Sequence, residues 1–371
     1  MIPVSEPLIG RQEARWVREC LETGWISSEG RFIPAFESAF ADLCGRRHGV
    51  AVNNGTNALI LALRALALPA GSEVIVPAFT IISCALACID NGLVPVFVDA
   101  ERDTWNMAID QIEARISPRT RAIMAVHIYG HPVDMDGLQA IADRHHLLVI
   151  EDFAEAIASE YRGKKCGSFG RVSCTSFYAN KLISTGEGGM CLTDDEELAA
   201  AMRRLRNLAF VPEQRFVHQE LGFNFRMTNI QAAIGLGQLA NTKSRLKKKI
   251  VMAKRYRSLL ADLERRGLIV LPAQRPQTVN SYWMFGILLT KKSGCQAAAV
   301  MKELAEKGIQ TRPFFYPLHR QPAFRPFPWF KEMSLPVSEE LYQYGLYLPS
   351  GLTLRKAQME KVAAALAEIL P

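Results

Sequence analysis

Residues 50–67 read VAVNNGTNALILALRALA, a short apolar run followed by a turn and then by a longer apolar pattern. The pattern predicts a strand at 50–53, a turn that uses Gly55, and a helix over 57–67. A helix that begins after such a turn presents unpaired N–H groups and the positive end of its dipole. This is a place for an anion, most simply a phosphate, although Asn or Thr before a helix is more often only a cap.

The same strand and helix unit repeats along the first two thirds of the chain. Short β-branched or aromatic runs predict strands at 50–53, 73–76, 94–98, 122–127, 147–151 and 174–178. Helical patterns separate them at 57–67, 82–91, 136–145 and 195–208. The alternation predicts an α/β fold with a mainly parallel central sheet and helices on both faces.

The pattern changes after residue 245. Strands are predicted at 267–271 and 283–290, and helices at 294–307 and 352–369. We therefore expect a large α/β domain, with the N-terminal segment, over 1–245 and a smaller C-terminal α+β domain over 246–371. Residues 312–329 are rich in proline and aromatic residues, so we expect a structured loop there that forms one wall of a ligand site.

Composition narrows the functional classes. The chain has 371 residues, 49% of them hydrophobic and 22% charged, without an apolar segment of membrane-spanning length, so we expect a cytoplasmic protein with no membrane partner. The eight cysteines include no CxxC pair, and we expect no metal site. The net charge is +7, but the concentrated basic run lies on one helical pattern at 243–257. A solvated helix face explains this run better than a nucleic-acid partner does.

In sheets of this kind ligands bind beyond the C-terminal ends of the strands. Asp152 follows the apolar run 147–150, and Lys181 lies in the stretch SFYANKLISTGEGG at 176–189. Singly, Asp152 could be a helix cap and Lys181 a surface lysine. Together with the phosphate-ready helix they suit pyridoxal phosphate, because a lysine forms its Schiff base and a carboxylate keeps its ring nitrogen protonated. The chain has no GxGxxG motif after a strand and no GxxxxGK[ST] motif.

Ten segments carry a resemblance that covers nearly the whole chain. They are GWISSEG, NNGTNAL, GSEVIVPAFT, PVFVDAERDTWN, VHIYGHPVDMD, VIEDFAEA, SFYANK, TGEGGM, GFNFRMTNIQAAIG and TRPFFYPLH. In this order they resemble the DegT/DnrJ/EryC/StrS family of sugar aminotransferases, which are fold type I pyridoxal phosphate enzymes.

The resemblance implies roles for individual residues. Lys181 would form the Schiff base (internal aldimine) and act as acid and base, and it would be free when the cofactor is in its pyridoxamine form. We expect desolvation and the neighbouring cation to lower its pKa. Asp152 would pair with the ring nitrogen. The remaining cofactor-binding residues implied are Gly55, Thr56, Ala154, Glu155, Ser176 and Asn224. Asn224 would reach the phosphate of a partner subunit, which implies a homodimer with shared active sites.

Other positions are implied near the substrate or depart from the family. Arg312 and His319 match a region that meets the nucleotide sugar, and Asn180, Phe315 and Tyr316 are candidates for the sugar pocket or for packing. At the position of Ile81, family members have an aromatic residue that stacks on the cofactor ring. Its absence should cost about 1 kcal/mol of cofactor binding. Alternation along the strand argues against replacement by Phe79 or Phe153. His127, at a strand end, could lie near the site or could be a structural histidine with satisfied hydrogen bonds.

The resemblance implies transfer of an amino group from glutamate to a nucleotide-linked 4-keto-6-deoxy sugar. Within the family, the segments are most similar to those of members that convert GDP-4-keto-6-deoxy-D-mannose to GDP-perosamine. Another nucleotide keto-sugar, linked to UDP or dTDP and aminated at C3 or C4, is the alternative. A sugar dehydratase of the family carries histidine in place of Lys181, and a non-enzymatic regulatory protein on this fold would not need Asp152, Ser176 and Lys181 together.

Overall fold

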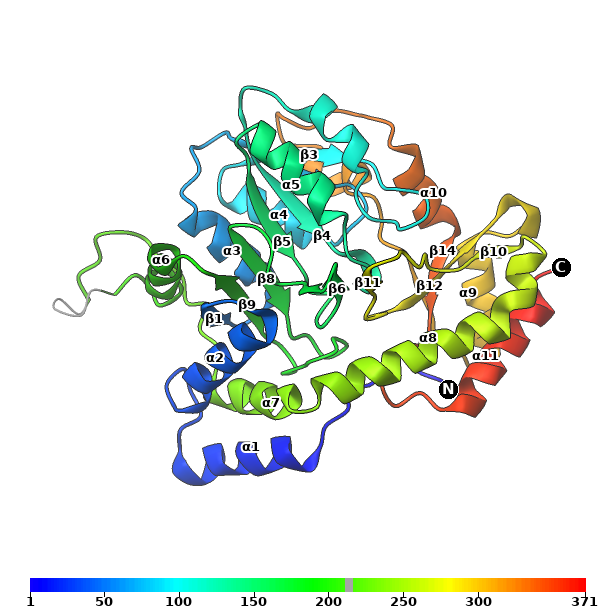
Figure 1. Ribbon diagram of the computed structural model, residues 1–371, viewed down its shortest axis with the longest axis horizontal. Helices are drawn as coiled ribbons and strands as arrows, with labels where there is room; N and C mark the ends of the chain where they lie inside the picture. The colour runs from blue at the N-terminus through cyan, green and yellow to red at the C-terminus, as the bar shows by residue number, and fades with distance from the viewer. Residues whose placement is uncertain (211–215) are drawn as a thin grey trace.

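The computed structural model describes residues 1–210 and 216–371 (Figure 1). Its central sheet has the order β1-β9-β8-β5-β4-β2-β3. The strands are β1 (His48–Val52), β2 (Glu73–Pro77), β3 (Val94–Val98), β4 (Thr120–Val126), β5 (Leu148–Asp152), β8 (Val172–Ser176) and β9 (Gly189–Thr193). Neighbours from β8 to β3 are parallel, while β9 runs antiparallel to β8 and β1. The predicted mainly parallel sheet is therefore confirmed.

Strand β9 is the one central strand that the sequence pattern did not predict, because it directly follows a glycine-rich stretch. Ser176 pairs with Gly189 across the antiparallel ladder. The two ends of the connection between β8 and β9 are thus hydrogen-bonded to each other. The Phe177 N–H also donates to the Gly188 carbonyl at 2.8 Å. Lys181 lies on this connection, at the C-terminal end of the parallel strands.

Helices cover both faces of the sheet. Hydrophobic residues of α3 (Gly55–Ala65), α4 (Ser83–Asp90) and α6 (Glu196–Arg206) pack on one face, together with Val50 and Val52. Ala51, between those two valines, packs on the other face with α2 (Phe32–Cys44) and α7 (Asn229–Leu239). Farther along that face lies α5 (Met135–Arg144). Helix α1 (Arg11–Thr23) packs on α7. The two-residue alternation of the strands therefore supplies two apolar layers.

A second unit follows at the far end of the long helix α8 (Thr242–Arg265) (Figure 1). Its antiparallel sheet has the order β10-β12-β14-β13. The elements are β10 (Ile269–Val270), β12 (Phe285–Leu289), α9 (Ala297–Glu306), β13 (Arg312–Pro313), α10 (Pro336–Tyr344), β14 (Gly345–Leu348) and α11 (Lys356–Ile369). A small sheet of β6 (Glu160–Tyr161), β7 (Lys164–Lys165) and β11 (Thr278–Val279) joins this part of the chain to the large unit.

The first residues of the chain contact the C-terminal unit as well as the large one. Ile2 forms a β-bridge with Ile309, and Ser350 N–H donates to the Val4 carbonyl at 2.7 Å. Ile2 therefore lies with the smaller C-terminal unit, while the side chain of Val4 packs in the core cluster that includes α3 and α4. A single bridge of this kind has no periodic pattern that could have predicted it.

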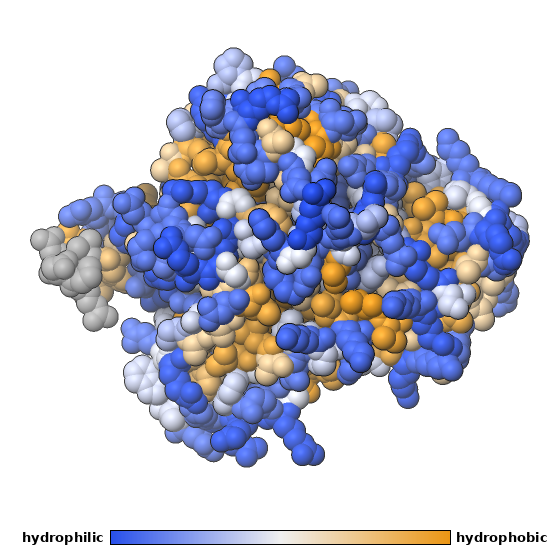
Figure 2. All heavy atoms as spheres, viewed as in Figure 1, coloured by the Kyte–Doolittle hydropathy of each residue, from blue (hydrophilic) through white to orange (hydrophobic). Residues whose placement is uncertain are grey.

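The basic helix α8 is only partly a solvated face. Hydrophilic side chains cover much of the face shown in Figure 2, across which α8 runs. Lys243, Lys247 and Lys248 are exposed, as predicted, but Arg245 and Lys249 are buried. Burial lowers the pKa of Lys249 to about 7. Among the described residues, no helix combines the length and apolar character needed to cross a membrane.

Candidate active site

The N-terminus of α3 forms a cradle at the end of β1. The Asn54 side chain caps the helix by accepting the Asn57 N–H at 2.8 Å. The backbone at residue 55 approaches Ser176 so closely that only glycine fits, because a Cβ there would lie 2.6 Å from Cβ of Ser176. The Thr56 hydroxyl lies 2.8 Å from the Ser83 hydroxyl at the start of α4. Hydroxyl groups and helix N–H groups thus meet in a small space that fits a phosphate.

Replacing Gly55 with alanine should disturb this cradle without touching the catalytic groups. We expect overpacking against Ser176 to lower the free energy of unfolding by about 1–3 kcal/mol and to weaken cofactor binding. Urea unfolding and spectroscopic titration with pyridoxal phosphate measure the two effects. Gly55→Ala combined with Ser176→Gly, which removes the closest opposing atom, should recover part of the stability. An unchanged stability in Gly55→Ala would contradict the close approach.

Asp152 ends β5 and is buried. Its Oδ1 accepts the Ala154 N–H at 3.0 Å, and the Cys84 thiol donates to Oδ2 at 3.5 Å. Burial raises the pKa of Asp152, while the Ala154 N–H and the nearby Lys181 oppose this rise. A buried carboxylate of this kind suits a cationic partner such as a protonated ring nitrogen.

Lys181 and Glu155 are both buried in the site and interact electrostatically. Desolvation lowers the pKa of Lys181, and the carboxylates of Glu155 and Asp152 oppose that effect. The pKa of Lys181 is thus lowered by desolvation, as expected, even without the cofactor. Glu155 Oε2 accepts the Tyr129 N–H at 2.6 Å. Burial raises the pKa of Glu155 to about 7, with Lys181 acting against the rise.

This shift makes the stability of the cofactor-free protein depend on pH. Between the ordinary value of 4.5 and about 7, the folded protein holds a proton on Glu155 that the unfolded chain has released. The free energy of unfolding should therefore fall as pH rises through this window. We expect the fall to be smaller in Glu155→Gln by roughly 1–3 kcal/mol. Urea unfolding at several pH values tests this, and equal pH slopes in the two proteins would contradict it.

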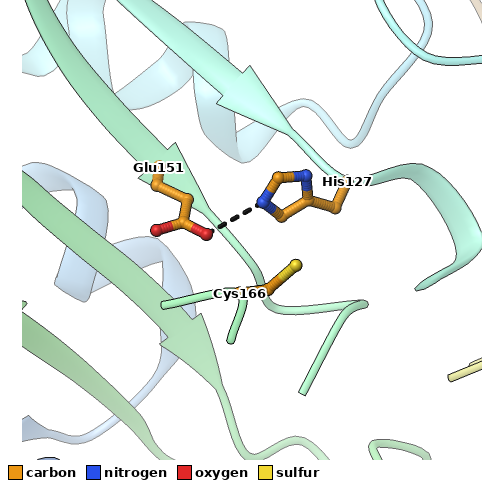
Figure 3. Close-up of side chains that lie close together, drawn as sticks. All are labelled: His127, Glu151 and Cys166. Carbon is orange, nitrogen blue, oxygen red and sulfur yellow. Dashed lines mark hydrogen bonds and ion pairs between the residues drawn. The ribbon is translucent and has the colours of Figure 1, made fainter. Parts of the chain in front are cut away.

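His127 is a structural residue. Its Nδ1 accepts the Val133 N–H at 3.0 Å, so its Nε2 carries the proton and donates to Glu151 at 2.9 Å. Figure 3 shows this pair with Cys166 beside it. The three side chains offer ligand atoms within 4.8 Å of one another. The Glu151 oxygens, however, already accept N–H groups of Gly167 and Phe169. This set is a satisfied buried network rather than a metal centre.

Two of the residues expected near the substrate line a separate cavity. Arg312 and Tyr316 contribute to a cavity of about 840 Å³ beside β13, α9 and α10, which Lys181 does not line. Arg312 is exposed, and it pairs with Tyr347 across β13 and β14. The Tyr347 ring lies 5.8 Å from that of Tyr129, whose N–H binds Glu155. Arg312 therefore lines the cavity, and its strand neighbour Tyr347 packs on Tyr129 near Glu155.

The other substrate candidates have different surroundings. Asn180 precedes Lys181 and accepts a hydrogen bond from the Trp283 indole through its carbonyl. Phe315 stacks on Tyr129 with ring centroids 5.4 Å apart. His319 is buried, and its Nε2 lies 2.9 Å from Glu339 of α10. The structure thus places Asn180 and Phe315 with the residues around Lys181 and Glu155, whereas His319 packs against α10, and a contact of His319 with the substrate stays a prediction.

Neither Phe79 nor Phe153 replaces the aromatic ring that is missing at Ile81. Ile81 is 46% exposed, so its side chain is available at the surface of the site. Phe79 is buried against Tyr129, Phe314 and Phe315, and Phe153 is buried against Phe40. Neither phenylalanine presents its ring at the surface beside Ile81, as alternation along the strand predicted.

Asn224, which the resemblance implied, makes no hydrogen bond to Lys181 or to the α3 cradle within the described part of this chain, and three other residues near the site had no pattern that could identify them. Asn224 lies on the surface of this chain and accepts a hydrogen bond from Arg226 Nε at 3.0 Å. Ser83 and Cys84 begin a helix that reads only as a core element. Trp283 precedes an apolar strand and reads as part of it, but its ring lies against Lys181.

Comparison with known proteins identifies the family of the chain. The model of the DegT/DnrJ/EryC1/StrS aminotransferase family matches residues 7–367. The chain is 44% identical to GDP-perosamine synthase of Caulobacter vibrioides, over 100% of this chain and 98% of that protein. It is 38% identical to GDP-perosamine synthase of Escherichia coli O157:H7, over 99% and 98%. The crystal structure of S. venezuelae DesV in complex with a ketimine intermediate superposes with a TM-score of 0.88, at 36% identity and over 96% of this chain and 93% of that one.

Proposed function

Since the chain belongs to the DegT/DnrJ/EryC1/StrS aminotransferase family, we propose that it transfers an amino group from glutamate to GDP-4-keto-6-deoxy-D-mannose, giving GDP-perosamine. It is a pyridoxal phosphate-dependent sugar aminotransferase. The observation that carries the choice of sugar is 44% identity, over the full chain, to a GDP-perosamine synthase. A nucleotide keto-sugar linked to UDP or dTDP is the second candidate, because a dTDP-sugar transaminase of Streptomyces venezuelae is 37% identical over 91% of this chain.

The residues around Lys181 fit the cofactor. Helix α3 with Gly55, Thr56, Ser83 and Ser176 would hold its phosphate, and Asp152 its ring nitrogen. Ala154 would lie against the ring, and Glu155 would meet its hydroxyl group. When bound, pyridoxal phosphate supplies a carbonyl that accepts the amino group and a ring that accepts electrons.

Lys181 would form the covalent link to the cofactor and would move the proton at the reacting carbon of each substrate. Its amine must lose its proton before it can accept another, and desolvation acts in that direction by lowering its pKa. Both half-reactions share this lysine, so ping-pong kinetics should follow.

Arg312, one of the cations that line the large cavity, would meet the nucleotide sugar. The Arg312 guanidinium is exposed, and its Nη1 donates to the Thr311 carbonyl at 3.1 Å, which leaves further N–H groups for a diphosphate. Asn180, Phe315 and Tyr316 would line the path toward Lys181. His319 is buried beside Glu339 and would act from behind these residues.

Asn224 would complete the phosphate site of a second subunit in a homodimer. Its exposed position on this chain is compatible with that role. If the sites are shared, Asn224→Ala should weaken cofactor binding by about 1 kcal/mol, which corresponds to the loss of one hydrogen bond. Equilibrium dialysis measures the affinity, and sedimentation checks that the dimer persists. Wild-type affinity in an intact dimer would rule out this contact.

An absorbance experiment tests the proposed reaction. We expect pyridoxal phosphate to give a protein-bound band that glutamate removes and that GDP-4-keto-6-deoxymannose restores. If glutamate removes the band but only a UDP- or dTDP-linked keto sugar restores it, the second candidate replaces the first. If no band forms with pyridoxal phosphate, the assignment of Lys181 is wrong.

A further inference from the structure

The Lys181 amine rests on an aromatic face. Its Nζ lies 3.7 Å from the centroid of the Trp283 ring. Lys181 comes from the connection after β8, whereas Trp283 comes from the segment before β12 in the C-terminal unit. An ammonium group at this distance is attracted by the negative face of an indole. The amine therefore lies where the two units of the fold meet.

The indole is held in place by groups on both sides of it. Its Nε1 donates to the carbonyl of Asn180, the residue before Lys181, at 3.0 Å. The Trp283 carbonyl accepts from Nζ of the buried Lys249 at 2.8 Å. The same Nζ also donates to the Ser350 carbonyl, at 2.5 Å. Lys249 thus ties Trp283 to the segment after β14, and the indole ties both to the loop that carries Lys181.

Simple core packing would not need this arrangement. The Trp283 ring lies 6.1 Å from that of Tyr129 and 6.5 Å from that of Tyr347, centroid to centroid, so other aromatic rings already surround it. The indole N–H nevertheless bonds the backbone next to Lys181, and the ring presents a face to the amine. Both features fix the position of one side chain, that of Lys181.

We propose that Trp283 is a positioning residue for Lys181. Its ring face holds the protonated amine whenever the amine is not linked to the cofactor, and its N–H fixes the loop on which the amine is carried. The inference rests on the proposed function, because it takes Lys181 as the reacting amine. Glu155 and Asp152 also favour the charged amine, and desolvation opposes all three. Without the ring, the balance should move toward the neutral amine.

The test is the pH dependence of Lys181 acetylation in the full chain freed of cofactor. Trace labelling with acetic anhydride follows the unprotonated fraction of an amine, and mass spectrometry reports the peptide that contains Lys181. The midpoint of the profile does not depend on how accessible the amine is. We compare the wild type with Trp283→Leu, with Trp283→Phe, which keeps a π face, and with Trp16→Leu, whose ring in the wild type packs on Phe32.

We expect a lower midpoint in Trp283→Leu, equivalent to about a fivefold larger unprotonated fraction at neutral pH. Trp283→Phe should lie between that variant and the wild type, and Trp16→Leu should match the wild type. Should Trp283→Leu not fold, the phenylalanine variant carries the comparison. Equal midpoints for the wild type and the Trp283 variants, or the same change in Trp16→Leu, overturn the inference.

A parallel measurement separates this inference from the proposed function. Borohydride reduction of the wild type with pyridoxal phosphate should fix the cofactor on Lys181. If it does not, the proposed function fails, whatever the midpoints show. If it does and the midpoints are equal, only the role of Trp283 is wrong.

Discussion

Lys181→Ala should lose transamination by roughly 10⁴-fold or more, because it removes both the covalent attachment and the proton carrier. We expect no band with pyridoxal phosphate and no borohydride fixation. The fold should persist, because desolvation already disfavours the charged amine at this position. Turnover assays with glutamate and the keto sugar, together with unfolding curves, measure both effects.

The matched control for this variant is Lys254→Ala, which removes an exposed lysine from α8. It should keep wild-type turnover and the wild-type absorbance band. Wild-type turnover by Lys181→Ala itself would disprove the assignment of the reacting lysine.

Asp152→Asn should have the second largest effect. The amide keeps the size of the carboxylate but removes its charge, so the protonated ring nitrogen would lose its partner. Breaking a buried ion pair costs about 3 kcal/mol, which corresponds to roughly a 10²-fold loss of turnover or of cofactor affinity. Because burial raises the pKa of Asp152, the cofactor-free variant should unfold no more easily than the wild type.

Asp99→Asn provides the contrast. Asp99 is also buried, but its carboxylate accepts N–H groups of Val337 and Ser338 at the start of α10. The amide there should lower the free energy of unfolding by about 1–2 kcal/mol and leave the affinity for pyridoxal phosphate unchanged. If Asp152→Asn behaved like Asp99→Asn, Asp152 would be a structural residue and not the partner of the ring nitrogen.

The local patterns of the sequence were sufficient for six central strands and four helices of the large unit, although they did not identify α1, α2 and α7. The six predicted strands all exist, and strand 94–98 has the predicted limits. Such elements can be predicted because the apolar repeat reflects which side chains face the core. Strand β9 could not be predicted in this way, because a short run after several glycines acquires its structure only by pairing with β8 and β1.

The charges of α8 show the same limit. A run of lysines and arginines reads as a solvated face, and most of it is one. Arg245 and Lys249 are nevertheless buried. Their burial is tolerated because backbone carbonyls from distant segments accept their N–H groups. Helical spacing shows which residues share a face, but it cannot show which neighbour covers that face.

For the active site, the sequence by itself determined the chemistry: a lysine, a carboxylate and a phosphate-ready helix, each at a position matching one enzyme family. These features are local, since each depends on a strand end and the residues after it. The tertiary structure alone decided which distant groups surround them. It brings Trp283 to Lys181, Cys84 to Asp152 and Ser83 to Thr56. The Trp283 contact exists only because the two units pack together, and the other two exist only because the sheet of the large unit brings separate strand and helix ends side by side.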